Sequence, residues 1–159
     1  GSRSYCSFAK QMSLEMQRKS ALQQGLKQAL NFEELVPLYQ PIVDMKTNTL
    51  VGMEALLSWD SPSLGQVAPQ EFVPEAERSG MMTEIGQWIL KQACQQCLAW
   101  QKQTKIKLKL SVNVSAIQLT DHFIDTLDEV LTNTGFPAGR LTLELTESIF
   151  MLNINVEFV

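Results

Sequence analysis

Three side chains that carry oxygen, Glu54, Asn113 and Glu144, lie near the ends of three stretches in which polar and apolar residues alternate. Successive side chains of a β-strand point to opposite faces of a sheet, so each of the three faces away from the apolar residues of its own strand. Carboxylate and amide oxygens are the hard ligands that Mg²⁺ and Mn²⁺ prefer. The alternation has two interpretations, a divalent-metal site or a polar face that is merely solvated.

The segments between these strands favour the metal interpretation. Strands are predicted at about residues 36–44, 50–59, 106–114 and 141–146, and helices at about residues 69–79, 83–103 and 121–133. A strand followed by a helix and another strand is typical of parallel βαβ units. In a (β/α) barrel built from such units, helices cover the apolar face, and the active site lies at the C-terminal ends of the strands.

The length of the chain limits how much of a barrel it can form. It has 159 residues, whereas a complete TIM-type barrel typically needs about 250. We therefore predict an α/β fold that corresponds to the N-terminal half of a TIM-like (β/α)8 barrel. A long helix is predicted before it, from about residue 7 to residue 31, with leucines at four-residue steps.

The domain boundary is expected between residues 31 and 32. Gly1-Ser2 is typical of a scar left by an expression vector, and the helix after it is typical of a connector from an upstream segment. Residues 1–31 are thus interpreted as scar and linker helix, and residues 32–159 as the truncated domain.

Composition excludes several classes of protein. Charged residues make up 19% of the chain and the formal net charge is −4, which does not favour a nucleic-acid surface. Lys105, Lys107 and Lys109 are interpreted as strand alternation and not as a phosphate-binding patch. No apolar run approaches the roughly 18 residues of a membrane span, and no secretory signal is visible. We expect a cytoplasmic protein without membrane contact.

Cysteine spacing gives a weak signal. Cys94 and Cys97 have the spacing of a redox or zinc motif, and Cys6 makes the number of cysteines odd. The pair lies inside an amphipathic helix and has no second pair to complete a zinc site, which favours core packing.

Five motifs carry a family resemblance. In chain order they are Tyr39-Gln40-Pro41-Ile42-Val43-Asp44, Gly52-Met53-Glu54-Ala55-Leu56-Leu57, Phe72-Val73-Pro74-Glu75-Ala76-Glu77, Ser111-Val112-Asn113-Val114-Ser115 and Glu144-Leu145-Thr146-Glu147-Ser148. Together they resemble the EAL family of cyclic di-GMP phosphodiesterases, over about residues 35–152. Residues 5–30 also resemble the linker helix that follows a GGDEF-type diguanylate cyclase domain, which implies such a domain upstream.

The resemblance implies a fold and a site. Family members form a TIM-like barrel whose first strand is antiparallel to the others, and they use Mg²⁺ or Mn²⁺ to activate a water that attacks cyclic di-GMP. The implied metal ligands are Glu54, Asn113 and Glu144. Glu147 is implied to support a neighbouring active-site loop, and Gln40 and Leu56 to contact the nucleotide.

Two departures from the family pattern matter. The family usually has arginine two residues after the motif leucine, where it binds a phosphate, but this sequence has Ser58. Loss of that contact should weaken substrate binding by roughly 1.5 to 3 kcal/mol. The family's later half supplies an Asp-Asp-Phe-Gly metal loop, a lysine and further glutamate and glutamine positions, which are absent from this sequence.

We therefore expect a fragment of a cyclic di-GMP phosphodiesterase domain from a bacterial signalling protein, inactive on its own. The competing hypothesis is a degenerate module that senses cyclic di-GMP or contacts other proteins, and Ser58 favours it. The incomplete barrel should leave a free sheet edge near residues 141–146, which predicts a homo-oligomer.

Overall fold

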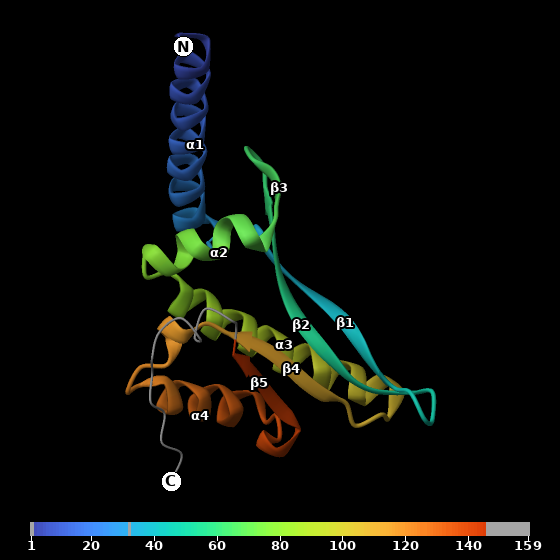
Figure 1. Ribbon diagram of the computed structural model, residues 1–159. Coiled ribbons are helices and arrows are strands. Elements are labelled where there is room, and N and C mark those ends of the chain that lie inside the picture. The colour runs from blue at the N-terminus through green and yellow to red at the C-terminus, as the bar shows by residue number, and fades with distance from the viewer. Residues whose placement is uncertain (1, 32, 146–159) are drawn as a thin grey trace. The chain divides into compact units, whose positions relative to one another are not determined.

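The computed structural model describes residues 2–31 and 33–145. The chain divides into two compact units: unit 1 comprises residues 1–36 and 58–81, and unit 2 comprises residues 37–57 and 82–159. The first two strands each belong to both units, because the divisions fall within them. Figure 1 shows the elements in chain order. No helix among the described residues is long and apolar enough to cross a membrane.

Unit 1 is built around α1 (Ser2–Ala29) and α2 (Pro69–Arg78). The four-residue leucine pattern buries Leu22 and Leu26. Gly25 of the same helix lies against the ring of Trp59. Trp59 is fully buried, contacts Phe72 edge-on with ring centroids 5.7 Å apart, and donates its ring N–H to Glu34 at 2.9 Å. These buried side chains give the unit a core of its own. The indole can be buried there because its N–H keeps a hydrogen-bond partner.

Polar contacts join the two helices of unit 1. Arg18 forms an ion pair with Glu71 at 3.0 Å, and Gln23 donates to Glu75 at 2.9 Å. Helix α1 is therefore packed against α2. A short strand, β3 (Gly65–Val67), pairs antiparallel with the end of the second strand and was not predicted.

Unit 2 contains most of the sheet, in the order β1-β2-β4-β5. Its strands are β1 (Leu35–Asp44), β2 (Thr49–Ser61), β4 (Lys109–Val114) and β5 (Leu141–Leu145). The pairs β2–β4 and β4–β5 are parallel, as the strand–helix–strand pattern predicts. Only residues 45–48 separate the neighbouring strands β1 and β2, and such a short connection requires an antiparallel hairpin.

Two helices cover one face of this sheet. The core joins Leu110 and Val112 of β4 to α3 (Met82–Thr104), and includes Val130 of α4 (Phe123–Thr134). Gly135 ends α4 in the left-handed conformation at φ 73°, as glycine commonly does at the C-terminus of a helix. The residues of β4 that alternate with these apolar ones consequently face away from the helices.

The predicted start of the third strand is wrong. The segment expected to begin at Ile106 enters the sheet only at Lys109, because Lys105 closes the preceding helix with φ 64° and Ile106 is exposed. Lys105 and Lys107 therefore lie in a connection and not in a strand, so the alternation interpretation fails for both.

Candidate functional site

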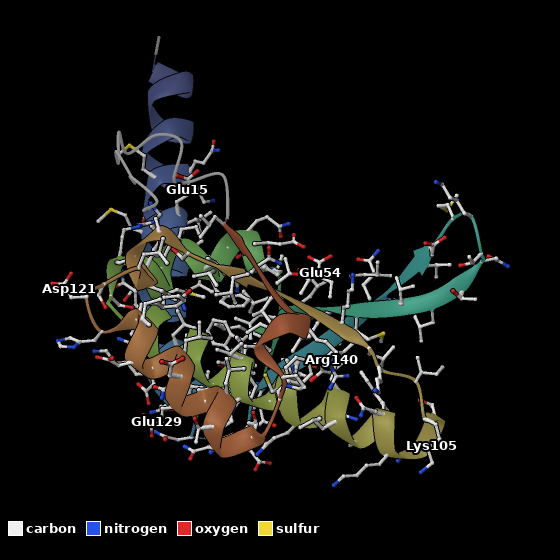
Figure 2. All side chains as sticks on the ribbon, turned by 90° about the horizontal axis from the view of Figure 1, so that it is seen from below. Glu15, Glu54, Lys105, Asp121, Glu129 and Arg140 are labelled. Atoms are coloured by element: carbon white, nitrogen blue, oxygen red, sulfur yellow. The ribbon has the colours of Figure 1, made fainter. Side chains whose placement is uncertain are left out.

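Parallel register brings four polar side chains to one face of β2, β4 and β5. Glu54 is the register partner of Ser111, and Asn113 is the partner of Glu144. Asn113 Nδ2 donates to Glu54 Oε1 at 3.0 Å, and Ser111 Oγ donates to Glu144 Oε1. Figure 2 shows Glu54 among the side chains of the sheet. We call Glu54, Ser111, Asn113 and Glu144 the polar row.

The polar row remains open to a ligand. Ser111 is buried, Glu54 and Asn113 are partly buried, and Glu144 is exposed. Among the ion pairs formed by the described residues, none involves Glu54 or Glu144. Two carboxylates that lie on one face and form no ion pair attract a cation and repel an anion.

The donor set suits a hard cation. Glu54 and Glu144 each offer a carboxylate, and the bond from Asn113 Nδ2 leaves its amide oxygen outside that contact. Such oxygens suit Mg²⁺ or Mn²⁺ better than Zn²⁺. Within residues 2–31 and 33–145, no three His, Cys, Asp or Glu side chains gather into a possible metal site. Besides the two carboxylates, a cation at the polar row would therefore need the Asn113 amide and ligands from outside the described His, Cys, Asp and Glu side chains.

The other predicted site residues have different surroundings. Gln40 is exposed on β1, and Leu56 is partly buried on β2, two positions after Glu54 and thus on the same face. Ser58 is buried and belongs to unit 1. Glu147 lies outside the described residues.

Sequence reasoning missed two features next to the polar row. It did not predict the bond from Ser111 to Glu144, and the parity that Ser111 shares with Asn113 was the available signal. It also missed the turn after β4, where Ser115 and Gln118 form a capping box around the short helix η1 (Ala116–Gln118). The Ser-x-x-Gln spacing is the sequence signature of that box.

Comparison with known proteins identifies the family. The family model of the EAL domain matches residues 23–157. The chain is 34% identical over 160 residues to the bifunctional diguanylate cyclase/cyclic di-GMP phosphodiesterase MucR of Pseudomonas aeruginosa, and the match covers 100% of this chain and 23% of that protein.

Solved structures agree with this match. The PaMucR phosphodiesterase in complex with c-di-GMP has a TM-score of 0.77 and 35% identity, over 84% of this chain and 54% of that one. The EAL enzyme Bd1971, bound to cAMP and cyclic di-GMP, has a TM-score of 0.76 and 30% identity, over 95% of this chain and 42% of that one. This chain thus spans about half of each solved structure and has part of their TIM-barrel-like fold. Because the family model matches most of the sequence, the chain belongs to the EAL domain family.

Proposed function

We propose that this chain is the N-terminal part of a cyclic di-GMP phosphodiesterase domain and supplies one side of its divalent-metal centre. The polar row carries the proposal, because parallel register aligns its carboxylates and amide on one sheet face. The MucR relative is named as a cyclic di-GMP phosphodiesterase, which supports this substrate.

In this proposal Glu54, Asn113 and Glu144 hold Mg²⁺ or Mn²⁺, and Ser111 orients Glu144. A bound divalent cation polarises the phosphodiester and lowers the pKa of a bound water. Cyclic di-GMP is an anion, so two uncompensated carboxylates would repel it and a cation is needed between them. Gln40 and Leu56 are proposed to contact the nucleotide, and Glu147 to support a nearby loop.

We further propose that the chain does not turn over substrate by itself. Three side-chain oxygens leave about half of an octahedral shell to other ligands. The family's later metal-binding residues are not in this sequence. A GGDEF-like domain upstream of α1 is proposed as the partner domain in the intact protein.

A metal titration with a matched control tests the proposal. Mn²⁺ binding, followed by calorimetry, should be weak in the wild-type chain and lost in Glu54→Ala. Glu129→Ala removes the same charge from an exposed position on α4 and should retain binding. Equal binding by Glu54→Ala and wild type would refute the metal site. Release of linear di-GMP by the chain would refute the predicted inactivity.

A second candidate function is cyclic di-GMP sensing without hydrolysis, and Ser58 in place of the family's arginine favours it. The two functions differ in their need for metal. A sensing module should bind cyclic di-GMP equally well with EDTA and with Mn²⁺, whereas the phosphodiesterase site should bind it only with Mn²⁺. Equilibrium dialysis of labelled cyclic di-GMP under both conditions separates them.

A further inference from the structure

We propose that Gln118 is a positioning residue for Asn113: it fixes the turn after β4 and is accommodated there only because residue 86 of α3 is glycine. The inference rests on the proposed metal-binding role of Asn113. It concerns how the chain itself holds that side chain, and no bound group is needed to examine it.

The end of β4 needs such support on its β2 side. Register pairs with β2 run only as far as Val112, whereas pairs with β5 continue to Val114. Asn113 therefore lies beyond the last β2 partner, and its side chain bonds to Glu54 across that gap. The turn after Val114 consequently affects where the Asn113 amide lies.

Reciprocal hydrogen bonds between Ser115 and Gln118 close this turn. The backbone N–H of Gln118 donates to the carbonyl oxygen of Ser115 at 3.0 Å, and the backbone N–H of Ser115 donates to Gln118 Oε1 at 2.9 Å. Both residues are buried, with 3% and 5% exposure, so water cannot easily replace the second bond. The side-chain amide thus satisfies a buried backbone donor only two residues after Asn113.

Gly86 provides the space for the Gln118 amide. A Cβ at residue 86 would lie 2.6 Å from Gln118 Cδ and closer still to Nε2. The adjoining cavity, lined in part by Gly86, Asn113 and Gln118, has a volume of about 30 Å³, about the room for one water. Any side chain at residue 86 should therefore expel Gln118 and release the turn.

A double-mutant cycle tests this chain of contacts, with Gly86→Ala, Gln118→Ala and the double variant. Each single variant should shift the NMR signals of the Asn113 side-chain NH₂ group and weaken Mn²⁺ binding about tenfold, as loss of an outer-shell support does. The double variant should bind like Gln118→Ala alone, because the added methyl group then has nothing to displace. Additive effects, or unchanged Asn113 signals in Gln118→Ala, would overturn the inference.

Val130→Ala separates positioning from general stability. Val130 is buried in the hydrophobic core of unit 2 and lies on α4. Its truncation should therefore lower the melting temperature and leave the Mn²⁺ affinity within about twofold of the wild-type value. Equal losses of affinity in Val130→Ala and Gln118→Ala would reduce Gln118 to an ordinary core residue. If Gly86→Ala does not fold, the Asn113 signals and the Mn²⁺ affinity of Gln118→Ala alone test the positioning role of Gln118. If the wild-type chain binds no Mn²⁺, the proposed function loses support, and the Asn113 signals still decide the role of Gln118.

Discussion

Each carboxylate of the polar row has one side-chain donor, and both donors come from β4. Asn113 holds Glu54 on one neighbouring strand, and Ser111 holds Glu144 on the other. Ordering a glutamate side chain costs up to about 2 kcal/mol in lost rotamer freedom. These bonds offset part of that cost before any cation binds. Strand β4 thus orients two carboxylates that belong to its neighbouring strands.

Ser58 provides a prediction about substrate affinity at the level of one residue. If it replaces a phosphate-binding arginine, Ser58→Arg should strengthen cyclic di-GMP binding by about 1.5 to 3 kcal/mol in a protein that includes the complete domain. Ser58→Lys is the control, because lysine carries the charge but cannot form a two-pronged contact. Binding would be measured by calorimetry with Ca²⁺ in place of the activating metal. Unchanged affinity in Ser58→Arg would remove the reason to regard Ser58 as the cause of weak binding.

The buried thiols of α3 predict a pH dependence of stability. Burial raises the pKa of Cys94 and of Cys97 from 9.0 to about 11. The folded state disfavours the thiolates. The contribution of the neutral thiols to the free energy of unfolding is therefore complete below pH 9 and is lost as pH rises through about 11. Urea denaturation should therefore give a midpoint that falls across this interval.

The double variant Cys94→Ala/Cys97→Ala isolates the thiols from other groups that titrate in the same range. Its midpoint should fall less than that of the wild type between pH 9 and pH 11. Parallel curves for the two proteins would contradict the assignment. The raised pKa values favour core packing over redox or metal chemistry for Cys94 and Cys97, since the thiolate is the nucleophile in both.

Among the elements, sequence periodicity predicted those that bury a continuous face. The pattern located α3, α4 and the polar parity of β4 because each packs against one core. It missed β3, which has three residues and is defined by its pairing with β2. It also started β4 too early, because an alternating pattern does not reveal that Lys105 adopts a positive φ. Pairing partners and backbone reversals depend on tertiary contacts that periodicity does not contain.

The same reasoning separates the predicted from the unpredicted part of the site. Glu54, Asn113 and Glu144 could be grouped because strand parity and parallel order fix both the face and the approximate depth. The support from Gly86 and Gln118 could not be predicted, because it depends on how closely α3 approaches the turn after β4. A glycine inside a helix costs about 1 kcal/mol of stability relative to alanine. The sequence alone does not show why α3 has glycine at residue 86.

Helix α1 gives a prediction at the scale of an element. Leu26 is fully buried in unit 1, whereas Met16 is 69% exposed on the same helix. Leu26→Ala should therefore lower the free energy of unfolding by about 2 to 5 kcal/mol, and Met16→Ala should change it by less than about 0.5 kcal/mol. Urea denaturation followed by circular dichroism compares them. Similar small effects would mean that α1 is a detached connector, as expected of a pure linker.

For the whole molecule, the two faces of the sheet have different roles. In unit 2, α3 and α4 pack against the face that carries Leu110 and Val112, and the opposite face carries the polar row. A barrel built in this way turns its polar face inward, so the strands that complete it would also complete the proposed metal centre. Under the proposed function, the rest of the domain would therefore complete the barrel and the site together.

Self-association is the prediction that belongs to the molecule as a whole. Among the described residues β5 pairs only with β4, and Leu145 at its end is 50% exposed. An unpaired strand edge with exposed apolar side chains favours pairing with a second copy. Light scattering at roughly 50 µM should give an average mass above that of the monomer.

Leu145→Lys should lower this mass, because a charge on an edge strand opposes pairing. Met45→Lys is the control, since Met45 is 93% exposed in the turn between β1 and β2. A wild-type chain that is monomeric under these conditions, or two variants with equal mass, would contradict association through β5.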